Sequence, residues 1–141
     1  VGYAMGHPKV IKQMDQVREV YNLDRLALVG AKAALLDQEY FKSCLAKVIE
    51  QRNWLANAFD DLGWTYVSSG TNFIFVKPLS SDGCASPEIA VSLFEHLAAD
   101  KILVRYFSKH PQTNCFVRIS IGKPVEMTML MKSIKAWTQK A

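Results

Sequence analysis

A charged guanidinium in the middle of an apolar strand is the feature that most constrains this chain. Residues 115–124 read Cys-Phe-Val-Arg-Ile-Ser-Ile-Gly-Lys-Pro, and successive side chains of a strand point to opposite faces. Val117, Ile119 and Ile121 therefore share one face, which we expect to be buried in a core. Arg118 lies on the opposite face, so this strand carries a cation on the side that faces away from the core.

Arg118 needs a partner wherever it is even half-buried, because a desolvated and unmatched guanidinium is costly. That partner is either a carboxylate of the chain or an anionic ligand. A second arginine, Arg105, lies in the middle of a strand expected over 102–107, and the polar loop 108–114 turns the chain back. The two strands should then be antiparallel and, where the register allows, bring the arginines together at one end of a small sheet. A phosphate or carboxylate ligand matches such a pair, since guanidinium groups bind either anion bidentately.

The remaining pattern predicts an α+β fold. A helical first half is followed by strand, strand, helix, strand, strand and helix, which indicates a small antiparallel or mixed sheet covered by helices. The apolar run over 72–76 predicts a strand covered on both faces. Further strands are expected over 1–5 and 64–67. Helices are expected from Pro8 to about Arg18, from Asp24, from Asp37 to Gly63, from Ser86 and from Pro124.

Composition excludes several classes of protein. The chain has 141 residues, the length of a single domain, and no apolar run near the ~18 residues of a membrane span. No export signal is recognisable, so we expect a cytoplasmic protein without a membrane partner. Cys44, Cys84 and Cys115 are widely spaced and form no CxxC, which argues against disulfides and a metal site. The net charge of +4 is scattered along the chain, which argues against nucleic acid as a partner.

Six segments of the chain stand out in order: Val1-Gly-Tyr-Ala, Val20-Tyr-Asn, Asp24-Arg-Leu-Ala, Asn72-Phe-Ile-Phe-Val, Ile102-Leu-Val-Arg and Val117-Arg-Ile-Ser-Ile-Gly. In this order and spacing they resemble the C-terminal part of the histidinol-phosphate aminotransferases, within the fold type I, class I/II, pyridoxal-phosphate enzymes. The resemblance covers essentially the whole chain. It implies that 1–22 form the end of a large domain and a connector, and that 23–141 form the aminotransferase small domain with its long joining helix.

The resemblance also assigns roles to individual residues. In the family, the Schiff-base lysine and the other pyridoxal-phosphate ligands precede the segment that matches Val1, which implies no catalytic and no cofactor-binding residue here. Arg118 matches the arginine that holds the substrate anion, and Arg105 matches a second arginine for the phosphate end of the substrate. Tyr21 and Asn22 fall near the substrate in the family, although a plain turn would also explain them.

The function that the resemblance implies is amino-group transfer between histidinol phosphate and 2-oxoglutarate, in histidine biosynthesis, by a homodimer. The chain alone should be inactive, since transamination needs the cofactor and a lysine base. One alternative is a fragment of an enzyme like threonine-phosphate decarboxylase. Another is a free-standing, non-catalytic module that binds a small anion or another protein. The apolar start at Val1 argues against that module and is what we expect of a chain cut from a longer one.

Overall fold

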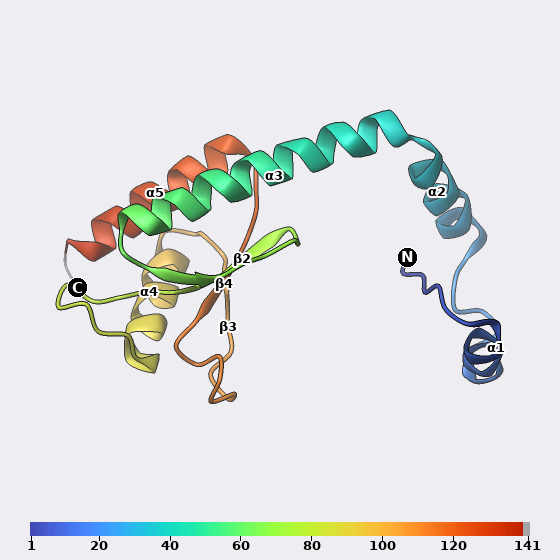
Figure 1. The fold of residues 1–141 in the computed structure, drawn as a ribbon, viewed down its shortest axis with the longest axis horizontal. Helices are drawn as coiled ribbons and strands as arrows, with labels where there is room; N and C mark the ends of the chain where they lie inside the picture. The colour runs from blue at the N-terminus through green and yellow to red at the C-terminus, as the bar shows by residue number, and fades with distance from the viewer. Residues whose placement is uncertain (140–141) are drawn as a thin grey trace. The chain divides into compact units, whose positions relative to one another are not determined.

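The computed structural model describes residues 1–139, and the chain divides into two compact units between Cys44 and Leu45. This division by compactness does not test the expected domain boundary after residue 22, which stays a prediction. The first unit is helical (Figure 1). It contains α1 (Pro8–Val17), α2 (Arg25–Leu36) and the beginning of α3 (Gln38–Asp61).

Side-chain caps begin the helices of the first unit where the sequence predicts them. Asp24 Oδ1 accepts the backbone N–H of Ala27 at 2.8 Å, and Asp37 Oδ1 accepts that of Tyr40 at 3.1 Å. Each carboxylate satisfies one of the four N–H groups that a helix leaves unpaired at its start. The predicted starts of α2 and α3 are therefore confirmed, as is the prediction that Gly63 ends α3, which it does with φ of 70°.

The prediction of a strand over residues 1–5 is wrong. This segment has no regular secondary structure, and the side chains of Tyr3 and Met5 are exposed. A strand exists only where a neighbouring strand pairs with its backbone, and no segment among residues 1–139 pairs with this one. Apolar composition alone was therefore a poor indicator here.

The second unit contains a four-stranded antiparallel sheet with the strand order β1-β2-β4-β3. The expected α+β class is confirmed, and the sheet is antiparallel rather than mixed. No helix within residues 1–139 is long and apolar enough to cross a membrane. The elements are β1 (Thr65–Val67), β2 (Phe73–Lys77), α4 (Pro87–Ala99), β3 (Arg105–Tyr106), β4 (Val117–Ser120) and α5 (Pro124–Thr138).

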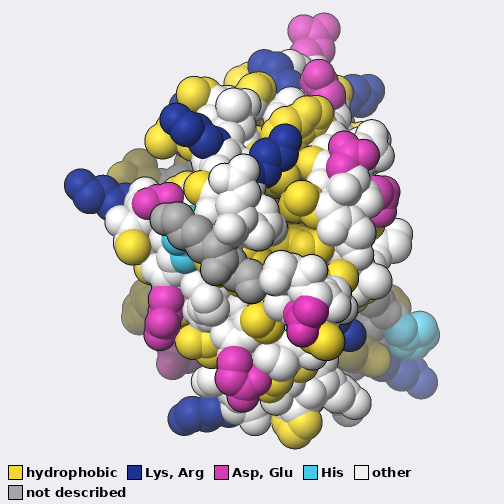
Figure 2. All heavy atoms as spheres, turned by 90° about the vertical axis from the view of Figure 1, so that its left-hand side faces the viewer, with side chains coloured by type: hydrophobic (Ala, Val, Ile, Leu, Met, Phe, Trp, Pro, Cys, Tyr) yellow, Lys and Arg dark blue, Asp and Glu magenta, His cyan; other side chains and the backbone are white. Residues whose placement is uncertain are grey.

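One face of this sheet forms the core with the end of α3, with α4 and with α5. Val117 and Ile119 of β4 are buried as predicted, together with Ile74 and Val76 of β2. Burial of such side chains contributes roughly 1.5 to 3 kcal/mol each. α5 buries an apolar stripe at helical spacing: Met127, Leu130, Met131, Ile134 and Trp137. Figure 2 shows the side of the molecule that lies at the left of Figure 1, where acidic, basic and apolar side chains are interspersed.

Two strand predictions need correction. Phe73 and Phe75 point to the second face of β2 and are only half-buried, so the described part of the second unit adds no further layer over that face. The strand expected over 102–107 shortens to the two residues of β3, because the backbone N–H of Ile102 already bonds to Leu97 O at the end of α4. The apolar run over 72–76 reflects an aromatic face, not burial on both sides.

Lys123 gives α5 an incomplete N-cap. Glu126 Oε2 accepts the Lys123 backbone N–H at 2.7 Å, but the lysine ammonium has no acceptor to offer in return. We expect Lys123→Thr to raise the free energy of unfolding by about 1 kcal/mol, measured by urea denaturation. Lys123→Ala removes the same charge without adding an acceptor and should give no comparable gain. Equal gains in both variants would attribute the effect to charge instead of capping.

Candidate functional site

The structure brings the two predicted arginines together. Arg105 of β3 and Arg118 of β4 are directly paired in the antiparallel register, so the expected proximity is confirmed. Directly opposed side chains in such a pair have Cβ atoms about 4.5 to 5.5 Å apart. Both residues belong to the face of the sheet opposite the helices. Two like charges placed this closely repel each other, which favours a bound anion between or beside them.

Neither arginine has a carboxylate partner within residues 1–139. The ion pairs there join Arg18 to Asp15 and His96 to Asp100, and neither the Arg105 nor the Arg118 guanidinium donates a hydrogen bond to an acceptor within this range. Of the two partners that the sequence leaves open for Arg118, the described chain does not supply the carboxylate. The guanidinium groups remain free to bind an anion from outside it.

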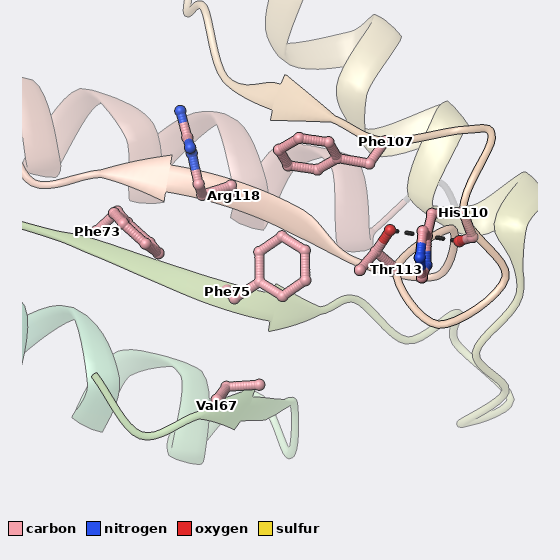
Figure 3. Close-up of a pocket in the computed structure, with 7 residues that line it drawn as sticks. All are labelled: Val67, Phe73, Phe75, Phe107, His110, Thr113 and Arg118. Atoms are coloured by element: carbon pink, nitrogen blue, oxygen red, sulfur yellow. Dashed lines mark hydrogen bonds between the residues drawn. The ribbon is translucent and has the colours of Figure 1, made fainter. Parts of the chain in front are cut away.

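Aromatic rings surround Arg118 instead (Figure 3). Its guanidinium carbon lies 5.1 Å from the ring centroid of Phe73 and 5.8 Å from that of Phe107. Its Nε atom is buried and has no hydrogen-bond acceptor in the described chain. An unmatched buried donor costs about 1 to 3 kcal/mol, and the negative ring faces offset part of that cost.

Beside Arg118 the open face of the sheet is hollowed into a cavity of about 480 Å³. Small-molecule sites measure roughly 300 to 1,000 Å³ and combine apolar walls with a few polar groups, and this cavity has both properties. Phe75 forms part of its lining, with its ring stacked on Phe116 at 5.0 Å. The lining residues, labelled in Figure 3, are Val67, Phe73, Phe75, Phe107, His110, Thr113 and Arg118.

The loop between β3 and β4 contributes His110 and Thr113, which the sequence does not mark as site residues. Thr113 Oγ1 donates a hydrogen bond to His110 O at 3.3 Å, and Tyr106 Oη donates to Asn114 O at 2.8 Å. Burial raises the pKa of Tyr106, so the phenol stays protonated and remains a donor near neutral pH. The Tyr106–Asn114 bond ties the loop to the sheet at one end of the cavity, and the Thr113–His110 bond closes a turn within the loop.

Tyr21 and Asn22 lie in the connector between α1 and α2, in the first unit. Tyr21 is 94% exposed, and Asn22 Oδ1 accepts a hydrogen bond from Arg18 Nη1 at 3.2 Å. The structure neither adds them to the cavity lining nor tests their predicted proximity to substrate, which stays a prediction. Among residues 1–139, no three His, Cys, Asp or Glu side chains are grouped so that they could hold a metal ion.

Comparison with known proteins identifies relatives of the whole chain. The family model described as "Aminotransferase class I and II" matches residues 1–134. The histidinol-phosphate aminotransferase of Syntrophotalea carbinolica is 39% identical over 134 residues, which are 95% of this chain and 36% of that protein. The histidinol-phosphate aminotransferase of Geotalea daltonii is 41% identical over 127 residues, which are 90% of this chain and 34% of that protein. The chain thus spans about a third of the length of these curated relatives.

Solved structures share the fold. The histidinol-phosphate aminotransferase of Sinorhizobium meliloti, in complex with pyridoxal-5'-phosphate, superposes with a TM-score of 0.79 at 23% identity, over 94% of this chain and 35% of that one. A putative aminotransferase from Burkholderia pseudomallei gives a TM-score of 0.72 at 24% identity, over 92% of this chain and 37% of that one. At these identities the likeness concerns the fold.

Proposed function

Because the chain belongs to the class I and II aminotransferase family, we propose that it is the C-terminal part of a histidinol-phosphate aminotransferase. The curated relatives that carry this name are 39% and 41% identical to it. The proposed reaction transfers an amino group between histidinol phosphate and 2-oxoglutarate, in the cytoplasm, in a homodimer. Residues 1–22 would end the large domain, and 23–141 would form the small domain.

The observation that carries this proposal is the unpaired Arg118 at the edge of an aromatic cavity, with Arg105 paired opposite it. An aminotransferase binds two anionic substrates in turn at one site. A guanidinium accommodates both, since its planar fork matches carboxylate and phosphate oxygens equally well. In this proposal Arg118 binds the substrate anion and Arg105 binds the phosphate end, while Tyr21 and Asn22 lie near the substrate.

Enzymes of this family use pyridoxal phosphate, which acts as an electron sink when it is bound. A site for it needs a lysine to bond its aldehyde and a cradle for its phosphate. The described lysines are exposed apart from Lys77, which is half-buried with its Nζ 4.9 Å from the ring of Phe116, and no lysine lines the cavity. These residues do not fit the cofactor, so what this chain contributes is recognition of the substrate.

The experiment that tests the proposal compares substrates in the complete polypeptide that carries this chain. We expect amino transfer from histidinol phosphate to 2-oxoglutarate, and no release of CO₂ from threonine phosphate. An enzyme like threonine-phosphate decarboxylase would give the opposite result.

The pure 141-residue chain is the control for this experiment. After it is mixed with pyridoxal phosphate and reduced with borohydride, we expect no single lysine to be modified stoichiometrically, and no transamination. Stoichiometric modification of one lysine, with activity, would contradict the assignment of this chain to substrate recognition alone. Inactivity of the complete polypeptide on both substrates would favour a non-catalytic, anion-binding module.

A further inference from the structure

The guanidinium of Arg118 makes contacts with aromatic rings and no hydrogen bond to an oxygen atom of the described chain. Phe73 and Phe107 lie on either side of Arg118 in Figure 3, and their ring centroids are 5.1 and 5.8 Å from its guanidinium carbon. These are cation–π distances. The buried Nε between them bonds to no acceptor. The orientation of the guanidinium therefore depends on ring contacts.

The sheet places these two rings next to Arg118. In the register of β2 and β4, Phe75 is opposite Arg118 and Phe73 is opposite Ser120, two residues further along the strand. On the other side Arg105 is opposite Arg118, and Phe107 comes two residues after Arg105 and points to the same face. Phe73 on β2 and Phe107, the residue after β3, thus each place a ring diagonal to Arg118, a spacing that aromatic side chains bridge.

Ring contacts leave the hydrogen-bond donors of Arg118 unused. A carboxylate partner would accept hydrogen bonds from the guanidinium N–H groups and so compete with an incoming anion. A ring face attracts the positive charge but is a weak hydrogen-bond acceptor, so it leaves the N–H groups available. Nη1 and Nη2 of Arg118 make no hydrogen bond within residues 1–139, and they are not buried as Nε is. The Nη edge is therefore the accessible edge of this side chain.

We propose that Phe73 and Phe107 are positioning residues that hold Arg118 with its Nη pair outward, so that the substrate anion binds end-on to Nη1 and Nη2. This inference rests on the proposed function, because it concerns the anion site of the same cavity. Phe107 also lies under the second arginine, with the guanidinium carbon of Arg105 5.3 Å from its ring centroid. Its loss should therefore disturb both cations.

The first test needs no ligand. Side-chain ¹⁵N NMR of the 141-residue chain resolves the Nε–Hε resonance of Arg118, which ring currents should displace from that of the exposed Arg25. Phe73→Leu and Phe107→Leu should each move the Arg118 resonance toward the position of Arg25. Phe116→Leu is the matched control, because Phe116 lies on the same face and stacks on Phe75 without a cation–π contact to Arg118.

The second test titrates the same samples with inorganic phosphate. We expect affinity to fall about three- to tenfold in Phe73→Leu and in Phe107→Leu, to be unchanged in Phe116→Leu, and to be largely restored in Phe107→Tyr, which keeps the ring. Backbone amide spectra confirm that each variant is folded. Arg118→Lys should abolish the response at this site, since an ammonium lacks the paired donors.

The outcomes separate the two proposals. If Arg118→Lys abolishes binding while the Phe73 and Phe107 variants bind like the wild type, the positioning role is overturned and the anion site stands. A change in the Arg118 resonance without a change in affinity also overturns that role. If the wild-type Arg118 resonance does not respond to phosphate, or Arg118→Lys binds unchanged, the anion site of the proposed function is overturned.

Discussion

Replacing Arg118 with glutamine should lower kcat/KM of the complete enzyme for both histidinol phosphate and glutamate by about 10²- to 10⁴-fold. Two charge-assisted hydrogen bonds are lost, each contributing about 1.5 to 3 kcal/mol, and each 1.4 kcal/mol corresponds to tenfold. No carboxylate in residues 1–139 pairs with Arg118, so the variant leaves no unmatched acid behind. The measured loss then reports on ligand binding.

Arg105→Gln is the matched control for this variant. Arg105 is exposed on the edge strand β3, and exposed charge pairs contribute about 0.2 to 1 kcal/mol. We expect a loss below about tenfold, larger for histidinol phosphate than for glutamate, because Arg105 is assigned to the phosphate end. Equal and large losses for both substrates in Arg105→Gln would reverse the two assignments. Full activity of Arg118→Gln would contradict the anion site.

Features of the fold that depend on neighbours in sequence could be predicted. The caps at Asp24, Asp37 and Ser86 each join a side chain to a backbone N–H three residues later, so composition and spacing contain the whole interaction. The face of Arg118 follows in the same way from the alternation of one strand. The connecting loop and the antiparallel geometry that it imposes predicted that Arg105 and Arg118 could lie close together, but their direct pairing depends on a register that the sequence left open.

The cavity could not be predicted, because its lining is assembled across strands. Phe73 reaches Arg118 through the register of β2 with β4, and Phe107 reaches it from beyond β3. Alternation along a single strand predicts which face of the sheet each ring lies on, but not which residue of the neighbouring strand lies opposite it. His110 enters the lining because its loop folds back on the sheet through the Tyr106–Asn114 hydrogen bond, and no local pattern encodes that contact.

The apolar stripe of α3 shows the same limit. Five apolar residues recur at helical spacing along α3, yet only the last two of them are buried: Phe41, Leu45, Val48, Leu55 and Phe59. Phe41 and Leu45 are 52% and 43% exposed. Helical periodicity predicts which face of a helix is apolar, but that face is buried only where another element packs against it.

Phe59→Ala should be the most destabilising single change in the second unit, lowering the free energy of unfolding by about 3 to 5 kcal/mol. The Phe59 side chain is fully buried, and its ring stacks on Trp64 at 5.7 Å and contacts Tyr66 at 6.4 Å. Its removal leaves a cavity between α3 and β1. Because domains of this kind have a total stability of only about 5 to 15 kcal/mol, the variant should be partly unfolded in mild urea.

Phe41→Ala on the same helix is the control, because it removes the same side chain from a half-exposed position. Urea unfolding followed by tryptophan fluorescence reports on the core directly, since Trp64 stacks on Phe59 and meets Trp137 edge-on at 5.9 Å. We expect the Phe41 variant to lose less than about 1 kcal/mol, as surface substitutions do. Similar losses in both variants would mean that the exposed half of α3 is covered in solution and that its stripe packs along its whole length.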